Sequence, residues 1–342
     1  MKATPIFNPS GNDATENRTI WFGETTNLMQ LNDIRYQWAF SLYEQMRANF
    51  WIPQRLDLTA DVTDYNNLTP QERRAFDGIL SYLTFLDSIQ TCNIPHLKLP
   101  ITAPEISLCM AEQISQEGMH NQSYQYMIET LIPNDRRDAV YDFWREDAVL
   151  LERCEYIAGL YQKYVDNPSD ENYFTALIAD YVLEGLYFYT GFNFYYTLAS
   201  RQLMAGSADI FRMINRDELS HVRLYQKILP EAITVFNPSI DQIYDIFGEA
   251  AKQEINWTNH IIGNDILGIS DQSTEQYVKF LTNKRLKAIG LEEIFSGFNK
   301  SPYVHLEKFA DTEGSANTKA NFFEATVTSY MMSSALDGWE DF

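Results

Sequence analysis

Apolar residues recur every three or four positions along most of the chain, which is the period of one face of an α-helix. Local signals agree, because Thr69-Pro70-Gln71-Glu72 is a capping box with proline at the first helical position. No alternating apolar and polar run of useful length favours a strand. The pattern therefore predicts an all-α protein, with helices at about 32–50, 69–91, 103–131, 135–165 (as one or two helices), 172–204, 208–229, 239–262, 271–289 and 291–297.

The stretches without this period divide the chain. Residues 1–26 are polar and predict an N-terminal arm, followed by a helical domain over 27–310 in which 52–68 is a loop. The composition then turns to Thr, Glu, Gly, Ser and Asn, which predicts a flexible C-terminal tail over 311–342. The tail ends in acidic sequence that carries Trp339 and Phe342. It is therefore either a solvated terminus or a peptide that docks on another protein.

Composition supports the helical prediction and restricts the partners. The chain has 15 glycines and 12 prolines in 342 residues, and 14% of its residues are aromatic, as expected for helices with bulky core side chains. Lys and Arg total 26 against 47 Asp and Glu, a net charge of −21. We therefore expect no nucleic-acid partner and no anionic membrane partner, which need clustered basic residues. A solvated acidic surface explains most of this charge, and carboxylates that hold a cation would add to it.

The cysteines and the longest apolar stretch bear on location. Cys92, Cys109 and Cys154 show no C-x-x-C spacing, so neither a zinc knuckle nor a dithiol redox motif is expected. An odd number of cysteines without a signal sequence favours a reducing cytoplasm. The stretch 181–198 is nearly apolar but carries Glu184, which fits a buried core helix better than a membrane span. We expect a cytoplasmic protein that does not enter a membrane.

Two Glu-x-x-His motifs point to metal chemistry. Glu117 and His120 lie three apart on a predicted helix and Tyr124 lies four further on, so all three project from one face. Glu218 and His221 repeat the pair about a hundred residues later. One such pair is weak evidence. Two of them are more telling, because a dimetal site in a four-helix bundle needs one motif on each of two helices and one carboxylate from each of the other two.

Asp87 and Glu184 are the candidates for the two remaining carboxylates. Each is a lone acid in an apolar stretch, where burial is costly unless a metal or partner compensates the charge. For Asp87, an exposed acid near a helix end is an open alternative, whereas the flanks of Glu184 are apolar on all sides. Four carboxylates and two imidazoles suit iron or manganese, while zinc more often takes fewer ligands or thiolates.

Tyr124 is one of 21 tyrosines, so an ordinary core aromatic is a strong alternative to a redox role. Its position one turn past His120 favours the redox role. Phe188, Phe192 and Ile214 fall on the faces of the neighbouring ligands and predict a dry pocket around the phenol, which would protect an oxidised tyrosine from quenching.

Three motifs together resemble those of one family: Leu-Asp-Ser-Ile-Gln at 86–90, Glu-Gly-Met-His-Asn-Gln-Ser-Tyr at 117–124 and Arg-Asp-Glu-Leu-Ser-His at 216–221. From about Trp38 to the C-terminus, the chain resembles the radical-generating small subunit of class I ribonucleotide reductase. The resemblance implies a ferritin-like helical bundle, a homodimer, and two metal ions per chain, iron or manganese with iron slightly favoured. One metal would be held by Asp87, Glu117 and His120 and the other by Glu184, Glu218 and His221, with bridging glutamates.

The same resemblance implies a tyrosyl radical and a route for it. Tyr124 falls on the family's radical tyrosine. Trp51, in a Phe-Trp-Ile-Pro sequence, would form a relay with Asp217 and the ligand His120. Tyr330 in the tail would pass the radical equivalent to the large subunit, which docks through the tail and reduces ribonucleotides to deoxyribonucleotides for DNA synthesis. Oxygen, or superoxide from an activating flavoprotein, would assemble the cofactor.

Two alternatives remain open from the residues alone. A stand-alone ferritin-like dimetal oxidase or hydroxylase would turn over without a partner and would not need the tail. An iron-storage or purely structural bundle would hold many irons or none. The structural bundle conflicts with carboxylates and histidines gathered in a core, because their desolvation would be uncompensated.

Overall fold

The computed structural model describes residues 4–310, and helices make up most of this part of the chain. It contains no strand in that range beyond one isolated bridge between Trp21 and Ile101, which confirms the all-α prediction. The helices are α1 (Gln37–Ala48), α2 (Thr59–Asn67), α3 (Pro70–Lys98), α4 (Pro104–Leu131), α5 (Asn134–Glu146), α6 (Ala148–Asp166), α7 (Asp170–Val182), α8 (Tyr189–Ser200), α9 (Ala205–Phe236), α10 (Ile240–Ile261), α11 (Asp271–Ala288) and α12 (Glu307–Ala310).

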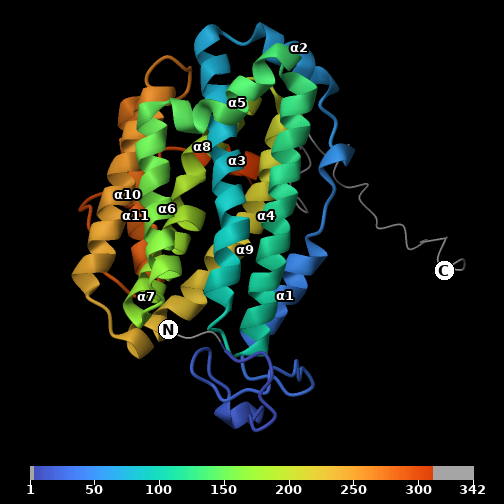
Figure 1. The fold of residues 1–342 in the computed structure, drawn as a ribbon. Helices are drawn as coiled ribbons and strands as arrows, with labels where there is room; N and C mark the ends of the chain where they lie inside the picture. Colours follow the sequence, from blue (N-terminus) through green and yellow to red (C-terminus); the bar gives the residue numbers. More distant parts are fainter. Residues whose placement is uncertain (1–3, 311–342) are drawn as a thin grey trace, which may run out of the picture.

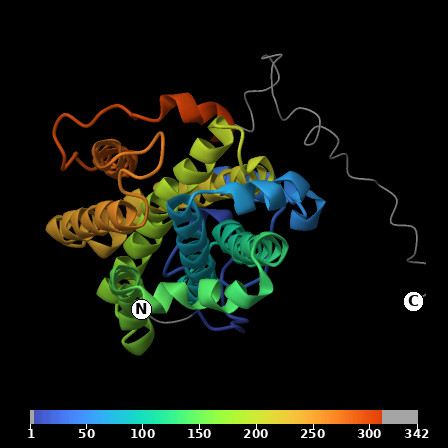
Figure 2. The same cartoon turned by 90° about the horizontal axis from the view of Figure 1, so that it is seen from above.

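The long helices α3, α4 and α9 and the α7–α8 pair form the core of the bundle. Figure 1 shows α3 and α4 side by side along the length of the molecule, and α1 packs on α4. Helix α9 contacts α4, α7 and α8. Seen from above, α10 and α11 lie on the opposite side of the bundle from α1 (Figure 2). None of the described helices has both the length and the apolar character that a membrane crossing requires.

Helix α2 lies within the segment 52–68, so the prediction of a loop there is wrong. The turn Pro53–Arg55 precedes it. The helix is short and weakly amphipathic, and a contact with α9 holds it in place. Buried Asp61 accepts hydrogen bonds from the backbone nitrogens of Gly206 (3.0 Å) and Ser207 (2.6 Å) at the start of α9. A carboxylate distant in sequence thus caps α9, which local patterns do not reveal.

Several predicted boundaries also differ from the structure. Helix α3 continues through Pro95 to Lys98 instead of ending near residue 91, with Ile94 and Leu97 buried in its last turns. Helix α1 is shorter than predicted and α9 longer. The helix predicted over 291–297 is absent from the structure. Asn283 holds this segment in an irregular form, since its side-chain oxygen accepts from two backbone nitrogens and its nitrogen donates to two carbonyls there.

The helix predicted over 172–204 is interrupted by a π-helical turn, Leu183–Tyr187, between α7 and α8. The turn contains Glu184 and is fully buried. A π turn inserts one extra residue into a helix and often marks a functional site. It therefore singles out Glu184 within an otherwise apolar stretch.

The described residues before α1 pack at one end of the bundle. The short turn Thr15–Asn17 is the one helical element among them. Buried Arg18 anchors them, because its guanidinium donates to Glu105 at the start of α4 (2.8 Å) and to the backbone oxygen of Asp33 (2.9 Å). The division into an arm over 1–26, a domain over 27–310 and a tail over 311–342 stays a prediction. The tail, with Tyr330, Trp339 and Phe342, lies outside the described residues.

Candidate metal centre

The six acidic and histidine residues singled out in the sequence meet in the middle of the bundle. Helix α3 contributes one carboxylate, the π turn contributes another, and α4 and α9 each contribute a Glu-x-x-His pair. Each is fully buried, with 0% exposure, so the alternative of an exposed acid at Asp87 is wrong. The six are Asp87, Glu117, His120, Glu184, Glu218 and His221.

These residues form two overlapping groups with metal-ligand geometry. Each group offers one ligand atom per residue, and within a group these atoms all lie within 4.8 Å of one another. Glu117 and Glu218 belong to both groups, so each can offer oxygens to two neighbouring ions. The first group is Asp87, Glu117, His120 and Glu218, and the second is Glu117, Glu184, Glu218 and His221.

Both imidazoles direct the same nitrogen, Nδ1, towards the carboxylates. The Nδ1 atom of His120 lies 3.1 Å from Glu218 Oε1 and 3.6 Å from an oxygen of Asp87. The Nδ1 atom of His221 lies 3.1 Å from Glu117 Oε1 and 3.2 Å from Glu184 Oε2. The two rings thus face the same cluster of oxygens, which is the arrangement that two adjacent ions require.

Several of these buried atoms have no hydrogen-bond partner in the described part of the chain. They are both oxygens of Asp87, both oxygens of Glu117, His120 Nδ1 and Glu218 Oε1. A buried polar atom left unpaired costs on the order of 1–3 kcal/mol, and more if it is charged. Bound cations would satisfy all six atoms at once, so the residues present fit a dimetal site.

The excess of carboxylates over imidazoles in the cluster also favours the binding of cations. Burial raises the pKa of Asp87 to about 7, and the neighbouring charge of Glu117 contributes to the rise. Burial and the charges of Glu184 and Glu117 raise the pKa of Glu218. Burial alone would lower the pKa of His221, but the surrounding carboxylates raise it well above its usual value. Even two protonated imidazoles would be outnumbered by four carboxylates, and divalent ions would remove this imbalance.

Neighbouring side chains fix the orientation of the two imidazoles. His120 Nε2 lies 3.4 Å from Asp217 Oδ2, and the Trp51 indole nitrogen donates to the same oxygen at 2.8 Å. His221 Nε2 lies 2.9 Å from the side-chain oxygen of Gln116. Such outer partners set the tautomer and the ring position of a metal-binding histidine. The structure thus brings Trp51, Asp217 and His120 together, as the expected relay requires.

Three glutamines around the centre were missed in the sequence. Gln90 and Gln113 both donate to Glu184 Oε1, at 2.6 and 2.7 Å, and Gln116 contacts His221. Gln90 follows Asp87 by three positions and Gln113 precedes Glu117 by four, so each shares a helix face with a candidate ligand. That spacing is the sequence feature from which a role for Gln90 and Gln113 at the centre could have been predicted. Glutamine is common on helix surfaces, however, and only the packing of the bundle shows that these are buried.

Tyr124 lies beside the first ligand group and is buried with 0% exposure. Its ring stacks on Phe211, with centroids 6.1 Å apart, and its hydroxyl has no hydrogen-bond partner among residues 4–310. Burial, followed by the charges of Asp87 and Glu218, raises the pKa of Tyr124 well above its usual value. The phenol therefore stays protonated at rest.

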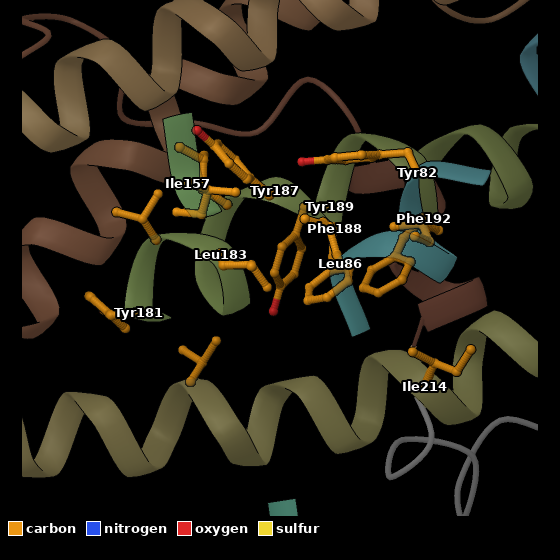
Figure 3. Close-up of a cluster of buried hydrophobic side chains, with 14 of the residues drawn as sticks. Tyr82, Leu86, Ile157, Tyr181, Leu183, Tyr187, Phe188, Tyr189, Phe192 and Ile214 are labelled. Carbon is orange, nitrogen blue, oxygen red and sulfur yellow. The ribbon is translucent and has the colours of Figure 1, made fainter. Parts of the chain in front are cut away.

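The side chains expected to keep water from Tyr124 are all buried. Phe188, Phe192 and Ile214 belong to one hydrophobic cluster, shown in Figure 3. The contact with the tyrosine passes through Phe211, whose ring centroid lies 6.0 Å from that of Phe192. Phe211 was not singled out in the sequence, because it lies seven residues before Glu218 among other apolar positions of α9.

Comparison with known protein families identifies the family to which the chain belongs. The family model described as ribonucleotide reductase, small chain, matches residues 28–302. The chain belongs to the ribonucleotide reductase small-chain family. This confirms the expected family, the ferritin-like helical bundle and the enzyme class, an oxidoreductase of ribonucleotide reduction, and it does not support a stand-alone oxidase.

Individual members of the small-chain family cover nearly the whole chain. The ribonucleoside-diphosphate reductase subunit beta of Treponema pallidum is 39% identical over 98% of this chain and 97% of its own length. That of Halalkalibacterium halodurans is 34% identical over 100% of this chain and 99% of its own. The structure of the R2 subunit from Clostridium botulinum aligns with a TM-score of 0.85 at 40% identity, covering 91% of this chain and 99% of that one. Membership of the small-chain family implies work with a large subunit and a homodimer.

Proposed function

We propose that this chain is the radical-generating small subunit of ribonucleoside-diphosphate reductase, a cytoplasmic protein that initiates the reduction of ribonucleotides to deoxyribonucleotides in its large subunit. The observation that carries the proposal is the pair of buried ligand groups that share Glu117 and Glu218. Two metal ions, iron or manganese with iron favoured, would supply the oxidising equivalent after activation by oxygen or by superoxide from a flavoprotein. The protein side chains would hold these ions, keep the site dry and direct protons.

The proposed ligands divide between two ions. Asp87 and His120 belong to one group alone and would hold the first ion, while Glu184 and His221 would hold the second. Glu117 and Glu218 would bridge the two. The hydrogen bonds from Gln90 and Gln113 leave one oxygen of Glu184, Oε2, directed at His221 Nδ1 and the second ion position.

Tyr124 is the proposed site of the stored radical. A phenol with a high pKa can lose its electron only if it loses its proton at the same time. Asp87 carries the negative charge that acts most strongly on the phenol, which supports its carboxylate as the proton acceptor. The stack with Phe211 excludes water from one face of the ring. The chain would thereby separate the oxidised ring from solvent reductants.

The proposed outward relay runs from His120 through Asp217 to Trp51. Asp217 Oδ2 is shared between the two rings, at 3.4 Å from His120 Nε2 and 2.8 Å from the indole nitrogen of Trp51. Trp51 lines a pocket of about 620 Å³, and its neighbour Phe50 is 56% exposed there. An exposed aromatic residue at a pocket rim is typical of a protein contact. The large subunit would meet the relay at this pocket, and Tyr330 of the tail would continue it.

Breaking the relay should stop turnover without disturbing the centre. In Trp51→Phe, we expect metal content and the tyrosyl signal to persist while deoxyribonucleotide formation falls by about a hundredfold or more, equivalent to about 2.7 kcal/mol in the activation free energy. Metal analysis, electron paramagnetic resonance and a turnover assay with the large subunit measure the three quantities. Trp144→Phe is the matched control, because Trp144 stacks on Phe85 at a centroid distance of 4.0 Å, away from the relay. Normal turnover in Trp51→Phe would remove the relay from the proposal.

Removal of the end of the tail should separate docking from cofactor assembly. A chain that ends before Ala335 lacks Trp339 and Phe342 and should lose association with the large subunit, measured by sedimentation or surface plasmon resonance. Metal content should equal that of the full chain, since the proposed ligands all precede residue 222. Full activity of the truncated chain in the reconstituted complex would refute the docking role.

One experiment tests the proposed function as a whole. The apoprotein is loaded separately with iron and with manganese, exposed to oxygen or to superoxide, and assayed with the large subunit. We expect about two ions per chain and deoxyribonucleotide formation with at least one metal. Binding of many irons per chain, or substrate oxidation without a large subunit, would instead support storage or a stand-alone oxidase.

A further inference from the structure

A second pocket lies between α8, α9, α11 and the segment from Ser301 to Ala310, apart from the pocket beside Trp51. Its volume is about 250 Å³, which is the size of a small organic molecule rather than of a peptide. Aromatic rings from α8 and α11 line it together with polar groups from α8, α9 and α11. The proposed function uses none of these polar groups.

Arg285 is the most unusual residue of this pocket. It is 4% exposed, yet within the described chain no carboxylate lies close enough for an ion pair. Its Nε donates to the backbone oxygen of Gly185 at 2.8 Å, and its guanidinium carbon lies 4.9 Å from the Tyr189 ring centroid. Other buried arginines of this protein are paired with carboxylates, as Arg153 is with Glu254. A buried cation without an anionic partner is rare, because its desolvation is then offset only in part.

Three further polar atoms that line the pocket have no hydrogen-bond partner in the range 4–310. They are Asn193 Nδ2, Asn215 Oδ1 and the hydroxyl of Tyr189, and their residues are at most 8% exposed. Buried polar atoms in native proteins are nearly always paired with protein, water or ligand. Three residues that line the pocket together with Arg285 thus carry a donor, an acceptor and a hydroxyl without a partner.

The charge around the pocket is positive, in contrast to the acidic chain as a whole. Lys284 lies beside Arg285, and Glu307 also lines the pocket. Partial burial and the adjacent Arg285 lower the pKa of Lys284. Tyr196, Tyr277 and Phe280 supply flat apolar walls. The pocket therefore combines an anion-binding end with a surface suited to a planar ring.

We propose that this pocket binds a small aromatic carboxylate. The carboxylate would accept from the guanidinium of Arg285, with Lys284 at the rim. The ring would lie between the aromatic walls, and Asn193 and Asn215 would bond a polar ring substituent. Binding would reach the metal centre through Gly185, because the backbone oxygen held by Arg285 directly follows Glu184 in the π turn.

The test uses the full-length, metal-loaded chain and three probes: benzoate, its neutral analogue benzamide, and acetate, which carries the charge without the ring. Saturation-transfer NMR and calorimetry measure binding. We expect benzoate to bind at least about tenfold more tightly than either of the others, since loss of a charge-assisted contact or of ring burial each costs about 1.4 kcal/mol or more. Equal binding of acetate and benzoate, or no benzoate binding at about 10 mM, overturns the proposal.

Variants show whether benzoate occupies this pocket. Arg285→Gln should weaken benzoate binding about tenfold or more. Lys287→Gln is the matched control, since it removes an exposed cation of α11 outside the pocket and should leave binding unchanged. Because Arg285 is buried and its replacement can destabilise the fold, Ala310→Trp provides a second test by filling the mouth from the partly exposed rim. Unchanged benzoate affinity in Ala310→Trp and in a folded Arg285→Gln chain would place the probe elsewhere and refute the site.

Discussion

Deoxyribonucleotide formation is expected to fall by about a thousandfold or more when Tyr124 is replaced by phenylalanine, equivalent to about 4 kcal/mol in the activation free energy. Phenylalanine keeps the ring stacked on Phe211 but has no hydroxyl proton to lose, so it cannot be oxidised at an accessible potential. The metal content should be unchanged, because Tyr124 is not one of the six proposed ligands. The measurements are electron paramagnetic resonance, metal analysis and turnover with the large subunit.

Tyr195 provides a matched control for this substitution. Its ring stacks on Phe211 at 3.7 Å, and its hydroxyl donates to the backbone oxygen of Phe76 instead of facing the carboxylates. Tyr195→Phe should therefore retain both the radical signal and turnover. If Tyr124→Phe is fully active, the oxidising equivalent resides on the metal pair and Tyr124 is a packing residue.

The second large effect is expected from Glu218→Ala. This residue belongs to both ligand groups, and its two oxygens lie 3.1 Å from His120 Nδ1 and 3.2 Å from His221 Nδ1. Its loss should reduce the metal content from about two ions per chain to near zero, and turnover with it. Metal analysis after dialysis measures the loss, and circular dichroism shows whether the helices persist.

A contrasting variant makes this prediction specific to the bridging position. Asp87 belongs to the first ligand group alone, so Asp87→Ala should weaken one ion more than the other. We expect the remaining ion to be held by Glu184, His221 and the two shared glutamates. Two ions retained in Glu218→Ala would contradict the shared role of that residue, and equal loss of both ions in Asp87→Ala would show that the sites do not fill independently.

The residues that gather at the candidate centre could be predicted because their signal is local. Glu117 and His120, like Glu218 and His221, occupy one helix face, and the acid Glu184 stands out against apolar neighbours. Helical periodicity then places such residues towards a core without knowledge of the tertiary structure. Together with the apolar period, these features were sufficient to predict the all-α fold.

The remaining features depend on contacts between segments distant in sequence. Asp61 of α2 accepts a hydrogen bond from the backbone nitrogen of Ser207 at the start of α9, 146 positions away. This bond holds α2 in place, and no local sequence pattern shows it. Asn283 satisfies the backbone of a loop that has the composition of a helix. Gln116 became part of the centre because α4 packs beside α9 and faces His221. In each case a polar side chain acts through packing, which the sequence alone does not specify.

The π turn at Leu183–Tyr187 restricts insertions and deletions in the segment that joins α7 to α8. One extra residue in a helix shifts everything after it by about 100° around the axis. Deleting one residue here would restore a regular α-helix. The same deletion would rotate Phe192 and the rest of α8 out of register with α9, or else turn Glu184 away from the other proposed ligands. A change in length here is therefore expected to disturb the site even when the deleted residue is not itself a proposed ligand.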